Sequence, residues 1–500
     1  MTGDGAVPMM TTLVVVGAGA AGIPAALAAL EEGAHVILIE KATRVGGMLW
    51  ASGAVTSGAE SELQRARGII DSAQAHYDEV FRAGRERADP TLLRLATDEA
   101  GRTIDWLVTL GTPFTADSPM VHGLADEHEQ YATPRSYLLD APDALGPYRG
   151  PVLAQVLERA LRSWLGSDLL RLMTDTTVVD LLAADGGVIG VRVIADGRPY
   201  EIRADAVLLT TGGYAANQDL LRRFHPDFDH LVTSGLGHAS GDGLVLAETL
   251  GGQVVNTDLV IPMMGAVADP NRPGFRLGDA MLTVGRPPAA SGDIWINKLG
   301  RRFVAEDTLS PDVRERAILA QPGAVMYAVF DEPMRVGLTD EVGRWTAHHL
   351  GDSPSPRLVR SAQSVRDLAQ RIGVDPEALE DTVGRYNSAQ NGPDDFGRKA
   401  MPAPVLRPPF HAVATASTLL ITFAGLRVDS ELRVLGPDGV PIPNLYAAGE
   451  LLGGGQIQGD AFSSGMSVTP AIAFGRIAAR RAVRAARGAC SPHDDDRSTV

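Results

Sequence analysis

The chain has 500 residues, more than a single hydrophobic core usually accommodates, so we expect two or three domains. Its formal net charge of -16 at pH 7 disfavours nucleic acid and anionic membrane surfaces as partners. The sequence has no run of eighteen apolar residues, no basic region ahead of its first apolar run, no Cys/His cluster and one cysteine, Cys490. These features predict a cytoplasmic protein without a membrane span, an internal disulfide or a bound metal.

A β-α-β unit opens the chain. Residues 13–22 read LVVVGAGAAG, an apolar run that ends in Gly17, Gly19 and Gly22, and the next buried strand ends in Glu40. The first glycine permits a tight turn, the second lets the backbone approach a pyrophosphate, and the third lets helix and strand pack closely. Glu40 is placed to accept hydrogen bonds from a ribose. The pattern therefore predicts a dinucleotide site.

A second glycine loop follows directly. Residues 41–55 read KATRVGGMLWASGAV, in which Gly46 and Gly47 are followed by Met48, Ser52 and Gly53 among small side chains. A nicotinamide domain has no need of this loop, whereas a larger cofactor whose ring lies further along the chain does. The sequence therefore favours FAD.

The rest of the chain divides into segments that differ in composition and periodicity. Residues 60–110 read as helices, 113–150 are rich in proline, and 175–213 alternate like a β-meander that ends in a glycine turn. From about residue 233 to 420, prolines and short elements indicate an inserted domain. After this domain come a strand pair, the stretch LYAAGE and the uncharged stretch AFSSGMSVTPAIAFG, which reads as a loop leading into a helix. The tail from 488 to 500 is predicted to be disordered.

Taken together, these motifs resemble the FAD flavoproteins related to soluble fumarate reductase and 3-ketosteroid Δ1-dehydrogenase. The matching pieces stand in the family order and include VVVGAGAAG, TTGGYAAN, ASGDGLVLAETLGG, NKLGRRFVAED and LYAAGELLGG. The resemblance implies an α/β fold, with a Rossmann-like FAD-binding domain split in sequence and an inserted α+β capping domain. The expected boundaries are 10–232 and 421–487 for the FAD-binding domain and 233–420 for the capping domain.

The resemblance also implies the cofactor contacts. Glu450 would hold the ribityl or ribose hydroxyls, Asp242 would lie at the domain border, and the backbone of Ser467 and Val468 would face the pyrimidine edge of the flavin. A helix starting near Met466 would direct its free N–H groups at the negative charge of a reduced flavin. Covalently flavinylated members carry a histidine near the second glycine loop, and this chain has none there, so non-covalent FAD is expected. The full set of expected cofactor contacts is Gly17, Gly19, Ala21, Gly22, Glu40, Lys41, Gly46, Gly47, Met48, Ser52, Gly53, Val178, Thr211, Gly212, Asp242, Glu450, Gly465, Ser467 and Val468.

At the substrate end the sequence departs from fumarate reductases. Their catalytic arginine falls on Ser310, and their carboxylate-clamping groups fall on Leu236, Ile421 and Phe462. An apolar pocket cannot desolvate two carboxylates without a large penalty, so fumarate and succinate are disfavoured. The predicted substrate pocket consists of Ile421, Phe423, Phe462 and Met466.

The remaining pattern suits a ketone or enone. Gly465 matches the glycine whose N–H helps polarise the substrate carbonyl in ketosteroid dehydrogenases, and such a contact would stabilise an enolate. The proton-exchanging group stays open between Tyr131, Ser310 and Arg314. Each also has a structural interpretation: packing for the tyrosine, a weak donor for the serine, and a solvated helix face for the arginine.

The leading prediction is an FAD-dependent oxidoreductase that transfers hydride between flavin N5 and a CH–CH or C=C bond next to a carbonyl. Its substrate would be an apolar, cyclic small molecule, acted on by a desaturase or an ene-reductase. Only one dinucleotide motif is visible, so an external electron acceptor or donor is expected. A dicarboxylate oxidoreductase and a flavin-binding protein without turnover are the alternatives.

Overall fold

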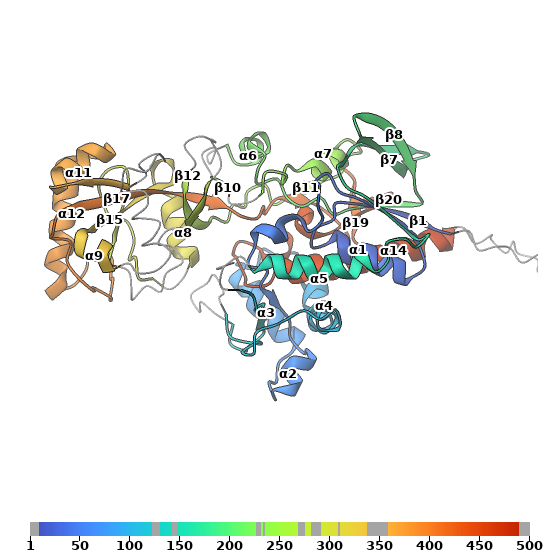
Figure 1. Ribbon diagram of the computed structural model, residues 1–500, viewed down its shortest axis with the longest axis horizontal. Helices are drawn as coiled ribbons and strands as arrows, with labels where there is room; N and C mark the ends of the chain where they lie inside the picture. The colour runs from blue at the N-terminus through green and yellow to red at the C-terminus, as the bar shows by residue number, and fades with distance from the viewer. Residues whose placement is uncertain are drawn as a thin grey trace, which may run out of the picture.

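The computed structural model describes residues 10–122, 131–142, 149–226, 232–233, 236–268, 276–281, 292–308, 311–337 and 359–489. Within these residues two lobes are evident, each built on its own sheet (Figure 1). The long strand β17 (Phe410–Leu419) runs through the second lobe and leads back to the first.

A six-stranded sheet forms the centre of the first lobe. Its strand order is β19-β20-β9-β1-β2-β5, and every neighbouring pair is parallel except β19 and β20. Its strands are nearly continuous apolar runs because both faces are covered. The predicted opening β-α-β unit is confirmed, with β1 and β2 in register from Thr12 opposite His35. The bounds are β1 Thr12–Val16, α1 Gly22–Glu31, β2 His35–Ile39, β5 Leu170–Met173, β9 Ala206–Leu209, β19 Arg433–Leu435 and β20 Pro441–Ala447.

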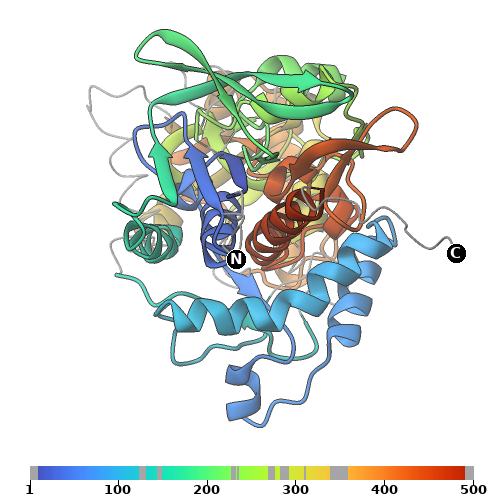
Figure 2. The same cartoon turned by 90° about the vertical axis from the view of Figure 1, so that its right-hand side faces the viewer.

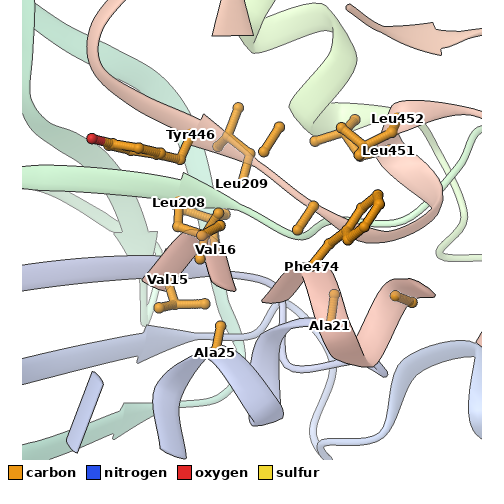
Figure 3. Close-up of a cluster of buried hydrophobic side chains, with 14 of the residues drawn as sticks. Val15, Val16, Ala21, Ala25, Leu208, Leu209, Tyr446, Leu451, Leu452 and Phe474 are labelled. Carbon is orange, nitrogen blue, oxygen red and sulfur yellow. The ribbon is translucent and has the colours of Figure 1, made fainter. Parts of the chain in front are cut away.

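Two helices from opposite ends of the chain lie side by side on this sheet. Figure 2 shows α1 next to α14 (Val468–Ala489), and a Cβ atom at Gly475 would lie only 2.1 Å from the carbonyl oxygen of Ala21. The close approach requires glycine at this position. Phe474 of α14 belongs to the buried cluster of Figure 3, together with Leu209 and Leu451. Further helices of this lobe are α2 Glu62–Ala66, α3 Ala73–Ala83, α4 Pro90–Thr109, α5 Gly150–Arg162, α6 Gln218–Phe224 and α13 Gly455–Gln458.

The predicted β-meander is also confirmed. It consists of β6 (Thr176–Ala184), β7 (Gly187–Ala195) and β8 (Arg198–Arg203), joined in antiparallel register. Both turns have the sequence Asp-Gly with positive φ at each residue, the backbone that favours tight hairpins. A short pair, β3 (Thr56–Ser57) with β4 (Ser136–Tyr137), joins the first helices to the proline-rich segment.

The second lobe is an α+β unit around a mainly antiparallel sheet. The strands follow the order β13-β12-β17-β15-β14, and β10 and β16 also pair with β17. Helices α11 and α12 lie at its outer end in Figure 1. The bounds are β10 Val232–Thr233, β12 Met263–Ala268, β13 Arg276–Met281, β14 Ile294–Ile296, α8 Pro311–Leu319, β15 Val325–Asp331, α9 Glu332–Gly337, β16 Val359–Ala362, α11 Val365–Ile372 and α12 Pro376–Ser388.

The chain returns to the first lobe between β10 and β12. Helix α7 (Asp242–Glu248) contacts β6, and β11 (Val254–Val255) pairs with β18 (Gly425–Leu426). Leu244 and Ala247 of α7 are buried in the core of the first lobe. The range 233–420 expected for the capping domain therefore contains a stretch that packs on the FAD-binding side.

Candidate active site

A cavity of about 310 Å³ opens at the carboxyl ends of the first sheet's strands. Val16 ends β1, Ile39 ends β2, Thr210 follows β9, and all three line the cavity. This edge of an open α/β sheet is where such folds bind their ligands. The cavity continues past the first residues of α14 toward residues 420–421, which follow β17.

The two glycine loops meet at this edge. Gly17 has φ +99°, and a Cβ there would lie 2.6 Å from the Thr210 carbonyl oxygen. Gly47 has φ +51°, and its Cβ would lie 3.1 Å from the Cα of Gly19. The N–H of Gly46 donates to the Ala18 carbonyl at 2.7 Å, which joins the loops. Backbone without side chains leaves room for a pyrophosphate, so this cradle fits a dinucleotide.

The acid at the end of β2 is held by the first loop. The Oε2 atom of Glu40 accepts from the Ala18 N–H at 2.9 Å, and Oε1 accepts from the Ala42 N–H at 2.8 Å. Each carboxylate oxygen keeps a second lone pair, so hydroxyl groups of a ribose can still donate to it. Glu40 lines the cavity at this point, and its contact with a ribose stays a prediction.

Charged and polar groups gather beside Glu40. Lys41 Nζ lies 2.7 Å from Asp242 Oδ2 and also contacts Ser240. His238 lines the same end, and its buried Nε2 has no hydrogen-bond partner among the described residues. Buried polar atoms are usually hydrogen-bonded, so this nitrogen could accept a partner from a ligand in the cavity. Sequence reasoning missed His238, although its place three residues before the Gly-Asp-Gly turn is a signal.

Glu450 lies further along the cavity. Its Oε1 atom accepts from the backbone N–H of Thr422 at 2.9 Å and from the hydroxyl of Thr422 at 3.2 Å. Burial raises the pKa of this carboxyl to about 7. A carboxylate held in this way can accept hydrogen bonds from ribityl or ribose hydroxyls, the role expected for it.

A rigid turn precedes α14. Gly465 has φ +81°, and a Cβ there would lie 2.4 Å from the Ser57 backbone nitrogen. Gln458 ties the turn together, because its Oε1 accepts from the Ser463 N–H at 2.8 Å and its Nε2 donates to the Ser467 hydroxyl at 3.1 Å. Helix α14 begins at Val468, two residues later than the sequence suggested, because Gly465 to Ser467 form the turn.

Of the residues predicted to contact the cofactor, all line this cavity except Gly22 and Gly46. Gly22 packs beneath the first loop, where a Cβ would lie 1.8 Å from the Gly17 carbonyl oxygen, which is the packing role of the third glycine. Gly46 joins the two loops through its N–H.

Three of the four predicted pocket residues, Ile421, Phe462 and Met466, line the cavity. Phe423 is buried behind it with Leu259 and Ile261 and does not line it. The charged side chains that line the cavity are Glu40, Lys41, Asp242 and Glu450, and none of the described lining residues is an arginine.

The candidates for proton exchange lie in different places. Tyr131 is 1% exposed and does not line the cavity, and its hydroxyl donates to the Ser464 carbonyl at 2.8 Å. Arg314 is buried in α8, outside the cavity lining. Ser310 lies outside the described residues. The structure instead brings His122 to the cavity wall, a residue that sequence reasoning missed because only the fold brings the proline-rich segment next to the turn at Gly465.

The described residues contain no cluster of three potential metal-binding side chains and no helix long and apolar enough to cross a membrane.

Comparison with known proteins identifies the family. Residues 12–465 match the FAD binding domain family. The chain is 30% identical to a cytochrome-type fumarate reductase of Shewanella frigidimarina over 94% of its length, which covers 77% of that protein. It is 30% identical to the vinyl phenol reductase of Lactiplantibacillus plantarum over 91% of its length and 92% of that protein. It is 31% identical to the NADH:fumarate oxidoreductase of Klebsiella pneumoniae, of which it spans about half, 49%.

Solved structures agree. A flavocytochrome c3 fumarate reductase in an open conformation superposes with a TM-score of 0.75, at 28% identity over 96% of this chain and 79% of that one. The 3-ketosteroid Δ1-dehydrogenase of Sterolibacterium denitrificans shares the fold, with a TM-score of 0.77 at 20% identity over 95% of this chain and 100% of that one.

Fold and site thus define a flavoprotein with a Rossmann-like FAD-binding domain and a capping domain. The chain belongs to the FAD binding domain family, is similar to the soluble fumarate reductases, and is an FAD-dependent oxidoreductase. It shares its fold with the 3-ketosteroid dehydrogenases.

Proposed function

We propose that the protein transfers a hydride between FAD and a C=C or CH–CH bond next to a carbonyl, in a neutral and apolar small molecule. The observation that supports this proposal most strongly is the distribution of charged side chains along the cavity. The charged lining residues are those assigned to the cofactor, whereas Ile421, Phe462 and Met466 make the part around Gly465 largely apolar, beside the imidazole of His122. A dicarboxylate placed there would lose its hydration without gaining an arginine partner among the described lining residues.

The relatives support the reaction class. They include reductases named for fumarate and for vinyl phenol, which share reduction of a C=C bond. The vinyl phenol enzyme matches this chain over nearly the full length of both, and its substrate carries no carboxylate. This agrees with a cavity whose described lining residues include no arginine, and it supports a neutral substrate for this chain.

The turn at Gly465 supports carbonyl recognition. Its left-handed backbone faces the cavity next to the first turn of α14, whose N-terminal N–H groups favour negative charge. Donors placed where charge develops lower the energy of an enolate-like transition state. Bound FAD supplies the hydride chemistry, and the turn would polarise the substrate carbonyl.

The electron partner is external in this proposal. The sequence has one dinucleotide motif, so the flavin would exchange electrons with a separate carrier or acceptor. We assign the protein to the cytoplasm, where one cysteine in 500 residues suits a reducing environment. Non-covalent attachment of FAD completes the proposal.

Anaerobic spectroscopy tests this function in both directions. Dithionite-reduced protein is mixed with cyclohexenone, 4-vinylphenol or fumarate, and oxidised protein with a 3-ketosteroid, a cyclic ketone or succinate. We expect the visible flavin band to return with an enone, or to bleach with a ketone. A response to fumarate or succinate alone would favour the dicarboxylate alternative. No response to any compound would favour a flavin-binding protein without turnover.

A further inference from the structure

We propose that His122, held in place by Ser464, is the residue that exchanges a proton with the substrate carbon. This inference rests on the proposed function, because it assigns the proton that must accompany hydride transfer. The proton-exchanging group is the part of the site that the sequence left open.

The imidazole of His122 lies at the correct end of the cavity. It lines the cavity, and its Nδ1 lies 2.7 Å from the Ser464 hydroxyl oxygen. Ser464 directly precedes Gly465, the residue assigned to the substrate carbonyl. The α-carbon that gains or loses a proton is bonded to that carbonyl carbon, so a base for it must stand close to the carbonyl contact.

Ser464 is itself held firmly. It is 1% exposed, and its carbonyl oxygen accepts from the Tyr131 hydroxyl at 2.8 Å. The Tyr131 ring packs edge-on against His76, with ring centroids 5.6 Å apart, and lies 5.1 Å from the Arg135 guanidinium. Arg135 is fixed by a bidentate pair with Asp71. Tyr131 is thus a positioning residue, which acts on the imidazole through Ser464.

The other titratable groups of the described cavity wall have different partners. Glu40 accepts from two backbone N–H groups, and Lys41 pairs with Asp242. Glu450 accepts from Thr422, and His238 lies near Glu40 and Lys41 at the dinucleotide end. This leaves His122 as the titratable side chain beside the turn at Gly465.

The chemistry suits an imidazole. When Nδ1–H donates to the Ser464 hydroxyl, Nε2 carries a lone pair that can take a proton, and the imidazolium form can return it. Partial burial lowers the pKa of His122 below its usual value, which favours the neutral base near pH 7.

The step balances in both directions. In reduction, the β-carbon gains a hydride, which carries two electrons from reduced FAD, the C=C π pair opens toward the carbonyl, and the α-carbon gains a proton from the imidazolium. In desaturation, the α-carbon loses its proton to neutral His122 and the β-carbon loses its hydride to oxidised FAD, which an external acceptor later reoxidises.

The test compares the FAD-loaded wild-type protein with His122→Ala and His122→Asn, using whichever enone or ketone the wild type accepts. Asparagine can still contact Ser464 but cannot exchange a proton. His35→Asn is the control, because His35 starts β2 at the end of the strand opposite the cavity. Two readouts are taken: the rate of the flavin change, with and without added imidazole, and the exchange of the ketone's α-hydrogen for deuterium in D2O, followed by NMR.

We expect both His122 variants to lose about 10²- to 10⁴-fold in rate, with flavin content and ketone affinity retained, and imidazole to restore part of the rate of His122→Ala. Deuterium exchange should fall in parallel, and the control should match the wild type. Wild-type rates in both variants would overturn the proposal. Full activity in His122→Asn alone would also overturn the proposal, because the side chain at position 122 would then be needed only for packing and not for proton exchange. A wild type that responds to no compound would instead refute the proposed function.

Discussion

Arg316 of α8 binds Asp460 across the two lobes: its Nη2 lies 3.0 Å from Asp460 Oδ1 and 2.8 Å from the Asp460 carbonyl oxygen. Arg85 of the first lobe holds the same residue, with Nη1 2.7 Å from Asp460 Oδ2. Asp460 stands five residues before Gly465, so this contact between the lobes also borders the turn that faces the cavity.

Loss of this contact is expected to loosen the second lobe. Arg316→Gln leaves a shorter polar side chain without charge, and a part-exposed ion pair contributes about 1 kcal/mol or less. We expect substrate affinity to fall about two- to five-fold and small-angle scattering to show a larger radius of gyration. Arg366→Gln, which removes an exposed pair with Glu380 inside the second lobe, is the control and should change neither quantity. Identical scattering profiles for Arg316→Gln and wild type would contradict the role of this contact.

FAD affinity should depend on pH through Glu450. Burial raises the pKa of this carboxyl to about 7, so it is protonated below pH 7 in the flavin-free protein. Accepting two hydroxyl donors favours the ionised form, so binding releases a proton and the affinity should rise with pH. The slope approaches tenfold per pH unit below pH 7 and levels off above it. Titration of FAD fluorescence at pH 6 and pH 8 measures this, and in Glu450→Gln the difference should vanish. An equal slope in that variant would assign the proton to another group.

Gly465 should tolerate no side chain. Gly465→Ala adds both the strain of φ +81° and a Cβ that would collide with the Ser57 backbone, 2.4 Å away. Gly439→Ala is the matched control, because its φ is +72° but no atom lies within 4 Å of the added Cβ. We expect about 1 kcal/mol of destabilisation for the control and a larger loss, with impaired flavin reduction, for Gly465→Ala. Urea unfolding and stopped-flow absorbance measure the two effects, and equal losses would show that the collision is relieved.

Loss of the Glu306 carboxylate should lower the free energy of unfolding and leave the rate of the flavin reaction unchanged. The carboxylate is fully buried, 2.7 Å from Arg302 and 3.2 Å from Arg398, and it also accepts from the Trp295 N–H at 3.0 Å. Glu306→Gln leaves two buried guanidinium groups undercompensated, which we expect to cost about 3–5 kcal/mol. Glu380→Gln removes an exposed pair and should cost less than about 1 kcal/mol. Urea unfolding compares the two variants, and similar small losses would show that Arg302 is satisfied by Asp394 alone.

The dinucleotide end could be predicted because its signals are local. The loop at Gly17, the acid at Glu40 and the loop at Gly47 lie within about thirty residues, and each has a backbone or hydrogen-bonding requirement that few residues meet. The role of Glu450 is predicted only by the family resemblance, and the structure adds that its carboxylate accepts a hydrogen bond from Thr422.

The substrate end could be predicted only in part because it is assembled from distant segments. His122 meets Ser464 across 342 positions of the chain, and no spacing rule encodes that contact. Ile421 and Phe423 both looked like pocket residues, but they lie in a loop without periodicity, and only Ile421 lines the cavity. Helix α7 fell within the expected capping range because its buried face could not be assigned to a lobe from composition.

The most direct measurement is the anaerobic reoxidation rate of the reduced flavoprotein by cyclohexenone and by fumarate, at equal concentration in one stopped-flow series. We expect faster reoxidation by cyclohexenone, by at least about tenfold, because Ile421, Phe462 and Met466 make this end of the cavity apolar and none of the described lining residues is an arginine that could pair with a dicarboxylate. Faster reoxidation by fumarate would contradict the proposed neutral substrate and would place a carboxylate-binding group in the cavity.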